Sequence, residues 1–357
     1  MDWKQRIPAA VLVTRLPRGR IGLVAARAAT WLYLVVVLAV WLLLRFAGER
    51  WWPATMMLFG PRWPYAAPLA VLVPVAAFLR PRLLWPLALS ALIVLGPILG
   101  FRLPWGRLVA PEGPPLRVLT YNVHGQSVTS EAMRDLIARV GPDIVALQEA
   151  SSEADYDWPD GWNVRRSGQF IVASPFPVRE VRHLEILHPG NVWPTKVLLE
   201  CLVETSEGDV PFGCVHLSTP RFGIMAVLDR STVLAPSRSG AIVEDTQKRR
   251  REAELLVEFL KASPATLIVA GDFNTPVDSV LYRRAWGRYR NAFCSSGMGV
   301  GHTMRPEVRG LQFGARIDHI LMRSDWWPRR CWVGPDMGSD HLPVVADLVR
   351  VPPTGRP

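Results

Sequence analysis

Three apolar stretches within the first 101 residues constrain the fold of this chain more than any other feature. They span residues 28–47, 64–79 and 83–101. The first has 20 residues and a single charge, Arg45, and about 20 apolar residues cross a bilayer core of about 30 Å. Tryptophans flank the stretches, as is typical of membrane interfaces: Trp51, Trp52, Trp63, Trp85 and Trp105. Residues 1–102 are therefore predicted to form a membrane region with about three transmembrane helices.

The second stretch is the weakest, because it is short and contains Pro68 and Pro74. Lys and Arg precede the first stretch, and Arg80 and Arg82 lie between the second and third. The positive-inside rule assigns both groups to the cytoplasm. Three spans then place the rest of the chain outside the cytoplasm, whereas two would place it inside. We favour three spans, which predicts an integral protein of the cell membrane with an extracytoplasmic second domain.

Charge divides the chain at the same place. Residues 1–115 contain 13 Lys and Arg against 3 Asp and Glu, whereas residues 116–357 contain 28 of each kind. The basic excess therefore indicates membrane topology and is not evidence for a polyanionic substrate. A linker rich in Pro and Gly at residues 103–115 marks a domain boundary. Residues 116–350 are predicted to form a second domain, followed by a tail at 351–357.

The second domain alternates β-prone runs with amphipathic helices. Residues 116–121 and 143–147 are apolar runs typical of buried strands. Between them, residues 130–140 carry apolar side chains at helical spacing, with Ser130 as the expected N-cap. Strands and helices that each end in polar residues are typical of a layered α/β domain with a site at its strand ends.

A hairpin is predicted for residues 196–204 and 210–216. Pairing them around Glu207 and Gly208 places Cys201 opposite Cys214. Two buried thiols are the favoured interpretation, and a disulfide in an oxidising compartment is the alternative.

Polar side chains follow most of the β-prone runs. One Asn or Asp alone is usually a turn former, but together these residues supply carboxylates, His and Asn with few compensating cations. Clustered carboxylates repel unless a cation holds them, and hard oxygen ligands suit Mg²⁺ or Mn²⁺. The candidates are Asn122, Glu149, His216, Asp272, Asn274, Asp318, Asp340 and His341.

Six motifs resemble, in order, those of the endonuclease/exonuclease/phosphatase superfamily. Within residues 116–349 they are TYNVHG, LQE, VHLS, GDFN, RIDHI and GSDHLPV. The resemblance implies an α/β fold, a four-layered α/β sandwich in which helices flank two packed mixed β-sheets. It also implies metal-dependent cleavage of phosphoester bonds. With its N-terminal helical transmembrane region, the chain resembles a membrane-anchored member of that superfamily.

The resemblance also implies roles for single residues. Glu149 is similar to the principal Mg²⁺ ligand, Asn122 to a residue that orients metal or phosphate, and Asp340 to a second carboxylate on the metal side. Asp272 resembles the residue that orients or deprotonates the attacking water, and Asn274 would fix that geometry.

The histidine motifs are similar to those that contact phosphate. His341 would touch the scissile phosphate and be held in position by Asp318, while His216 would stabilise phosphate charge or assist the leaving group. His124 is a departure, because abasic-site endonucleases tend to carry an acid there. The side chains expected to bind substrate are Asn122, Asn274 and His216.

The sequence therefore predicts a membrane-anchored phosphoric ester hydrolase that uses Mg²⁺ or Mn²⁺ to assist attack of water on phosphodiesters. The expected partners are a nucleic acid or phospholipid headgroup as substrate and the lipid bilayer around the spans; no protein partner is inferred. The alternatives are a phosphomonoesterase and a non-catalytic binding module on the same fold. The second is disfavoured because the main catalytic positions are all filled.

Two segments near these motifs have open or unassigned roles. Residues 221–245 contain several apolar side chains and form either a loop that recognises substrate or dips into the bilayer, or a plain surface helix. His183 and His188 match no motif, and both are expected to be solvated loop residues.

Overall fold

The computed structural model describes residues 18–153, 155–189, 192–228, 238–305, 307–308, 311–312 and 314–351. Among these residues there are two compact units. One contains residues 18–39 and 63–94, and the other contains residues 40–62 and the described residues from 95 onward.

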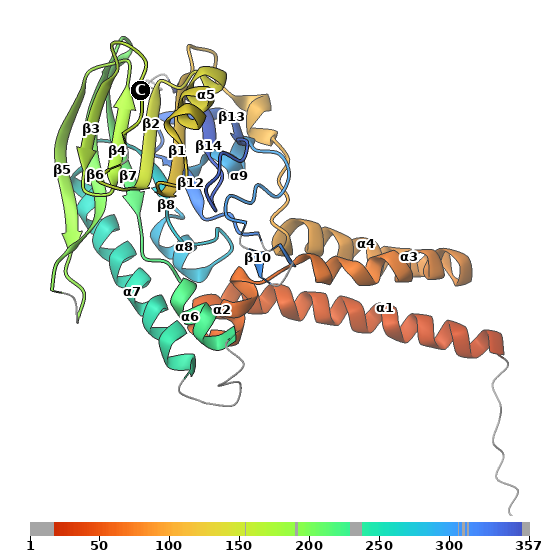
Figure 1. Cartoon of the computed structure of the whole chain (residues 1–357). Coiled ribbons are helices and arrows are strands. Elements are labelled where there is room, and N and C mark those ends of the chain that lie inside the picture. Colours follow the sequence, from red (N-terminus) through yellow and green to blue (C-terminus); the bar gives the residue numbers. More distant parts are fainter. Residues whose placement is uncertain are drawn as a thin grey trace, which may run out of the picture. The chain divides into compact units, whose positions relative to one another are not determined.

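The first unit consists of apolar helices (Figure 1). They are α1 (Arg18–Leu42), α3 (Ala67–Leu79) and α4 (Leu84–Ile93). Ile21–Arg50 and Pro81–Ile98 are each long and apolar enough to cross a membrane. Trp52–Phe59 and Trp63–Leu79 form a third candidate if this pair, bent by 85°, counts as one span. Helices thus occupy all three predicted stretches, and the crossing itself stays a prediction.

The second unit contains two six-stranded mixed sheets. The strands of the first sheet are β1 (Leu116–Gly125), β2 (Ile144–Ala150), β3 (Asn163–Ser167), β4 (Phe170–Ser174), β13 (Trp326–Val333) and β14 (Val344–Arg350). Those of the second are β5 (Val178–Ile186), β6 (Thr195–Thr205), β7 (Gly208–His216), β8 (Ile268–Asp272), β9 (Arg290–Asn291) and β12 (Asp318–Met322). β10 (Glu307–Val308) and β11 (Leu311–Gln312) pair separately.

Each sheet has one parallel pair near its centre. The strand orders are β13-β14-β1-β2-β4-β3 and β5-β6-β7-β8-β12-β9. β1 pairs in parallel with β2, and β7 pairs in parallel with β8. The carboxyl ends of each parallel pair therefore lie at the same edge of their sheet.

Helix α5 (Ser130–Val140) covers the outer face of the first sheet, and α7 (Arg238–Phe259) and α8 (Val280–Ala285) cover that of the second. Helix α6 (Arg221–Leu228) packs on α7, and α9 (Ala292–Ser296) packs against the core between the sheets. Along β1, Val118 packs in the core between the sheets, whereas Leu119 and Tyr121 pack with α5. This alternation is expected of a strand buried on both faces. The predicted four-layered α/β sandwich is confirmed (Figure 1).

Two local predictions were wrong. Thr129, rather than Ser130, is the N-cap of α5, and its side chain accepts a hydrogen bond from the Ala132 amide. In the hairpin, Cys214 lies opposite Leu199, and Cys201 lies opposite Phe212.

The hairpin register differs because the turn lies one residue earlier than expected. Thr205 pairs with Gly208, which has a φ of 103° that a glycine adopts readily. Every opposite pair moves by two positions as a result. Cys201 and Cys214 are buried free thiols, so the favoured interpretation is confirmed and the disulfide is excluded.

The prediction that His183 and His188 are solvated loop residues was right only in part: His183 is exposed but lies in a strand, and His188 lies in a loop but is buried. His183 lies within β5, where its side chain is 45% exposed. His188 is buried, and its Nε2 lies 2.8 Å from Oε1 of the buried Glu252. Glu252 belongs to helix α7, which is far from His188 in the sequence. The residues around His188 therefore gave no sign of this contact.

A segment between the first two apolar stretches packs into the second unit. It contains a 3-10 turn, Gly48–Arg50, and α2 (Trp52–Phe59). The Glu49 carboxylate accepts hydrogen bonds from the Val280 and Leu281 amides at 3.1 and 3.2 Å, at the beginning of α8. Arg62 forms an ion pair with Asp278. Residues 40–62 are therefore a structural part of the domain that follows them by sequence.

Candidate active site

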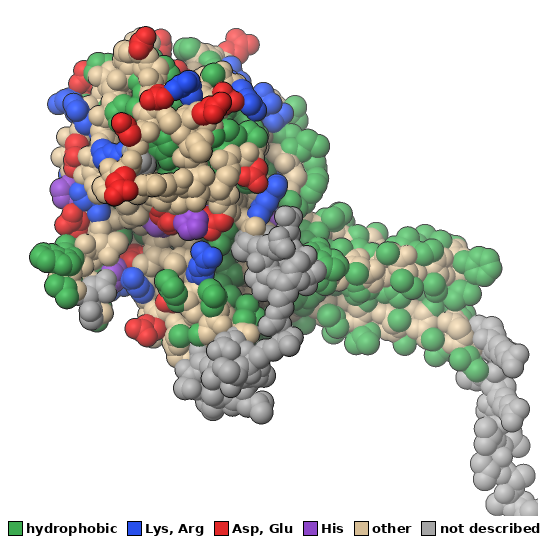
Figure 2. Space-filling view, in the orientation of Figure 1, with side chains coloured by type: hydrophobic (Ala, Val, Ile, Leu, Met, Phe, Trp, Pro, Cys, Tyr) green, Lys and Arg blue, Asp and Glu red, His purple; other side chains and the backbone are tan. Residues whose placement is uncertain are grey.

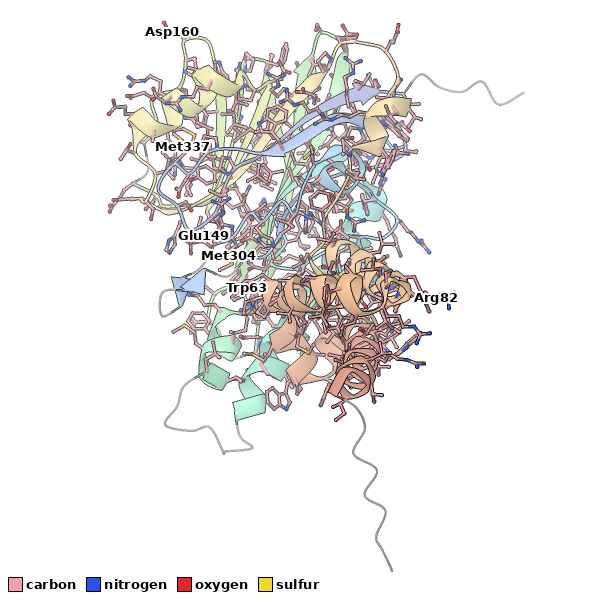
Figure 3. The ribbon with its side chains drawn as sticks, turned by 90° about the vertical axis from the view of Figure 1, so that its right-hand side faces the viewer. Trp63, Arg82, Glu149, Asp160, Met304 and Met337 are labelled. Carbon is pink, nitrogen blue, oxygen red and sulfur yellow. The ribbon has the colours of Figure 1, made fainter. Side chains whose placement is uncertain are left out.

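The candidate residues gather where strands of both sheets end. Asn122 precedes a bulge near the end of β1, and Glu149 lies near the end of the parallel β2. In the other sheet, His216 and Asp272 end the parallel strands β7 and β8 and are register partners. Figure 3 shows Glu149 at one end of the sheets and Asp160 at the other. The topology thus brings carboxylates, an amide and an imidazole to one edge.

Backbone strain is concentrated at this edge. His124, Glu149 and Asn274 are the non-glycine residues with positive φ among the described part of the chain, at 46°, 53° and 46°. Such conformations cost on the order of 1–3 kcal/mol each. Gly271 has a φ of 149°, and a Cβ there would lie 1.9 Å from the Val215 carbonyl oxygen. Only glycine allows the approach of β8 to β7 immediately before Asp272.

The Asp272 carboxylate is the centre of the site. It is 1% exposed. Its Oδ1 accepts a hydrogen bond from the Asn274 amide at 2.8 Å. Its Oδ2 accepts from Nδ2 of Asn122 and Nδ2 of Asn274, both at 3.1 Å. The Nε2 atoms of His216 and His341 each lie 3.8 Å from the same Oδ2.

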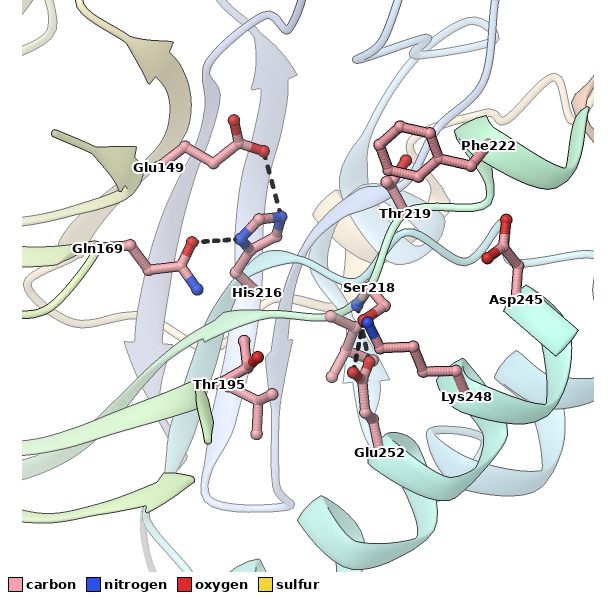
Figure 4. Close-up of a pocket in the computed structure, with 12 residues that line it drawn as sticks. Glu149, Gln169, Thr195, His216, Ser218, Thr219, Phe222, Asp245, Lys248 and Glu252 are labelled. Atoms are coloured by element: carbon pink, nitrogen blue, oxygen red, sulfur yellow. Dashed lines mark hydrogen bonds and ion pairs between the residues drawn. The ribbon is translucent and has the colours of Figure 1, made fainter. Parts of the chain in front are cut away.

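Glu149 lies beside this centre and is more open to solvent. Its Oε1 accepts from Nδ2 of Asn122 at 3.0 Å and lies 3.3 Å from Nε2 of His216. On the other side of the imidazole ring, Nδ1 of His216 lies 2.7 Å from Oε1 of Gln169 (Figure 4). Sequence reasoning missed Gln169. The only local signal is a polar residue directly before the apolar strand β4.

His341 is held by Asp318, as predicted from the motif order. Its Nδ1 lies 2.9 Å from Oδ2 of Asp318, and both side chains are buried. Burial alone would lower the pKa of His341, but the charges of Asp318 and Asp272 outweigh it and raise that pKa to about 10. Burial lowers the pKa of His216. The pKa values of the two imidazoles are therefore shifted in opposite directions, so His341 holds its proton to a higher pH than His216 does.

Asp340 lies apart from the other carboxylates. Its Oδ1 is 3.4 Å from Nδ1 of His124, and its Oδ2 is 3.7 Å from Nη1 of Arg221, the first residue of α6. Within the described residues, two clusters of ligand atoms could hold a metal ion, and neither includes Asp340. The clusters are Glu149, His216 and Asp272, and Asp272, Asp318 and His341.

The donors of these clusters fit a divalent cation. Burial, and then the charge of Asp318, raise the pKa of Asp272 to about 8. The negative charge of the buried carboxylates is therefore only partly offset by the surrounding groups, His341 included, and a cation bound by the carboxylate oxygens would offset the rest. Oxygen donors with one imidazole suit Mg²⁺ or Mn²⁺.

A cavity of about 230 Å³ opens beside Glu149 and His216. Thr195, Phe222 and Lys248 contribute to its wall (Figure 4). Glu149, His216 and Gln169 are therefore accessible to a small group from this side.

Comparison with known proteins identifies the class. The model of the Endonuclease/Exonuclease/phosphatase family matches residues 119–341, and the chain belongs to this family. Its members are phosphoesterases and nucleases that typically depend on a divalent metal. No curated protein sequence matches the chain.

Several solved structures are similar to this chain at low sequence identity. An endonuclease/exonuclease/phosphatase from Beutenbergia cavernae is 20% identical, covering 67% of this chain and 72% of that one, with a TM-score of 0.47. A 3'-5' exonuclease from Neisseria meningitidis is 19% identical, with coverages of 64% and 98% and a TM-score of 0.47. D. rerio TDP2, solved with a single-strand DNA product, is 16% identical, with coverages of 66% and 100% and a TM-score of 0.45.

The raised pKa of His341 predicts how stability depends on pH. In the folded state this residue keeps its proton up to a pH of about 10, whereas the unfolded chain loses it near about 6.5. The folded state therefore binds more protons between these values, so the contribution to stability is full below about 6.5 and is lost as pH rises to about 10. His341→Gln should flatten this part of the profile, measured by thermal unfolding in EDTA.

His183→Gln is the matched control, because the side chain of His183 is 45% exposed. It should leave the pH profile of unfolding unchanged. A His341→Gln profile parallel to that of the wild type would contradict the assignment of the raised pKa.

Proposed function

We propose that this protein is a membrane-anchored, divalent-metal-dependent phosphodiesterase. One observation carries the proposal: two asparagines and two histidines converge on the buried Asp272 carboxylate, next to the more exposed Glu149. Hydrolysis of a phosphodiester needs an activated water, neutralisation of phosphate charge and help for the leaving group. This set of side chains offers a group for each need.

Glu149 is proposed as the principal metal ligand, with Asn122 beside it. Asp340 is proposed as a second carboxylate on the metal side, although in this structure it lies outside both clusters and pairs with His124 and Arg221. The 3.0 Å hydrogen bond from Asn122 to Glu149 supports a shared role. Mg²⁺ or Mn²⁺ bound there would supply the positive charge that offsets the non-bridging phosphate oxygens.

Asp272 is proposed to orient the attacking water and to accept its proton. Its pKa of about 8 is near the value that suits a general base at neutral pH. Asn274 fixes the orientation of the carboxylate through two hydrogen bonds, at 2.8 and 3.1 Å. Asn122 and Asn274 are also proposed to contact the phosphate, and each would then give up one of the two hydrogen bonds that its Nδ2 donates in this structure.

The two histidines are proposed to act at different oxygens. Protonated His341, held by Asp318, would donate from Nε2 to a phosphate oxygen. Nδ1 of His216 donates to Oε1 of Gln169, so Nε2 of the neutral ring carries no proton. His216 would assist the leaving-group oxygen only after Nε2 receives a proton, and Oδ2 of Asp272, the proposed acceptor of the proton from water, lies 3.8 Å from Nε2. Gln169 would thus position His216 without adding a negative charge.

Loss of Asp272 should abolish hydrolysis. The full chain in detergent should hydrolyse bis(p-nitrophenyl) phosphate with Mg²⁺ or Mn²⁺ and lose this activity in EDTA. Asp272→Asn removes the base and should reduce kcat by about 10²- to 10⁴-fold. Asp209→Asn, at an exposed position of β7, is the control and should retain wild-type activity. Activity near the wild-type level in EDTA or in Asp272→Asn would contradict the proposal.

Membrane topology is proposed from the packing of residues 40–62. This segment joins the first candidate span to the second, and it packs with the catalytic domain through Glu49 and Arg62. The segment and the domain must then share one side of the membrane, so an even number of crossings separates them. If α3 and α4 both cross the membrane, the number of crossings is even and the condition is met. If α4 alone crosses, the number is odd and the condition is not met. With Arg80 and Arg82 in the cytoplasm, the catalytic domain is extracytoplasmic.

Cysteine labelling tests this topology. In right-side-out membrane vesicles, an impermeant maleimide should label Ser206→Cys, which lies exposed in the β6–β7 turn, because that turn faces outward. It should label Arg82→Cys only after the vesicles are opened, because the α3–α4 turn faces inward. The wild-type chain is the control for background from native thiols. Labelling of both positions in sealed vesicles, or of position 82 alone, would contradict the three-span arrangement.

A further inference from the structure

Helix α6 exposes an apolar stripe. Phe222, Met225 and Leu228 are 72%, 60% and 46% exposed, and their spacing of three places them along one side of the helix. Gly223 is buried instead, against Ile242 of α7. Only glycine fits this contact, because a Cβ at position 223 would lie 2.5 Å from the Cα of Ile242. The helix thus turns large apolar side chains outward and packs on α7 through a glycine. Figure 2 shows hydrophobic side chains on the surface over α6.

The stripe begins at the catalytic opening. Phe222 lines the cavity beside His216, and Lys248 lines the same cavity (Figure 4). Arg221, directly before Phe222, lies 3.7 Å from Asp340. The first residue of the helix is therefore a cation that pairs with Asp340 and borders the site. The cavity wall holds Lys248 together with the carboxylates of Glu149, Asp245 and Glu252, and the exposed side of the helix beyond Arg221 is apolar.

The stripe also lies close to the membrane-proximal segment. Ile242, which contacts Gly223 of α6, lines a groove between α7 and α2 together with Trp52 and Thr55. Helix α2 follows the first candidate span, and Trp51 and Trp52 are 50% and 41% exposed, as interface tryptophans are. α6 and α2 therefore lie on either side of the same turn of α7.

We propose that the exposed stripe of α6, Phe222, Met225 and Leu228, contacts the lipid surface and that the substrate is a membrane phospholipid. The inference rests on the proposed phosphodiesterase activity and names its substrate class. The headgroup phosphodiester would reach the site past Arg221 and Lys248, while the apolar part of the lipid would lie against the stripe. Exposed apolar side chains next to cations match the two halves of an amphiphile.

Nucleic acid fits the same surface less well. Single-stranded nucleic acid is bound by several stacked aromatic rings along a basic groove. The stripe offers one aromatic ring, and Met225 and Leu228 provide no stacking platform.

Paired substrates test the inference on the full chain in proteoliposomes. Headgroup release from vesicles of phosphatidylcholine, phosphatidylglycerol or phosphatidylinositol is compared with hydrolysis of bis(p-nitrophenyl) phosphate. A double variant, Met225→Ser with Leu228→Ser, should reduce headgroup release about tenfold or more, because it loses apolar contact with lipid. Hydrolysis of the soluble diester should not change.

A matched control separates this effect from a general loss of surface apolarity. Val181→Ser with Leu255→Ser changes two side chains that are 56% and 42% exposed in β5 and α7. It should leave both reactions at wild-type rates. An equal loss on both substrates in the α6 variant would overturn the inference.

Other outcomes distinguish the inference from the proposed function beneath it. A wild-type chain that hydrolyses the soluble diester but none of the phospholipids would overturn the inference alone. So would cleavage of single-stranded DNA that depends on Met225 and Leu228. A chain that hydrolyses neither kind of substrate would overturn the proposed function itself.

Environment-sensitive labelling gives a readout that does not depend on activity. An NBD fluorophore on Met225→Cys should emit at shorter wavelength in bilayers than in detergent-free water and should be quenched by lipid-borne spin labels. The same fluorophore on Val181→Cys should remain water-like and unquenched, after subtraction of the signal from native thiols. Water-like emission at position 225 in bilayers would overturn the inference.

Discussion

The site depends on one carboxylate, that of Asp272, held between two sheets and away from water. An uncompensated buried charge is costly, so it persists only where hydrogen bonds or cations offset it. Two asparagines donate to Asp272, and two imidazoles lie 3.8 Å from it. The parallel pairing of β7 with β8, which Gly271 permits, sets the depth of this carboxylate. The raised pKa of Asp272 shows that these contacts do not fully offset the cost of burying its negative charge.

The membrane-proximal segment is linked to the same site through Arg249. This fully buried residue of α7 donates from Nη1 to the Asn274 carbonyl at 3.0 Å and stacks over the Phe59 ring of α2 at 5.3 Å. Asn274 is also one of the strained residues of the site. Packing against α2 thus supports the loop that orients Asp272, which is why the full chain, rather than residues from 103 onward, is the relevant enzyme.

Much of the fold follows from local sequence patterns, because each buried strand is an apolar run that ends in polar residues. Those polar ends meet because parallel strands in two packed sheets end at the same edge. The approach of Gln169 to His216, and of Arg221 to Asp340, was not predictable, because each contact joins segments far apart in the sequence. The hairpin register depended on a turn displaced by one residue. The roles of the gathered residues stay predictions.

Metal binding tests the central claim, that the carboxylates around Asp272 form a site for a divalent cation. Electron paramagnetic resonance of Mn²⁺ titrated into the full chain in detergent would measure it directly. The account predicts one saturable Mn²⁺ site, for which Mg²⁺ competes. Glu149→Gln should lose this site, whereas the control Glu207→Gln, at an exposed position, should retain it. The absence of a saturable site in the wild type, or a site unaffected by Glu149→Gln, would contradict it.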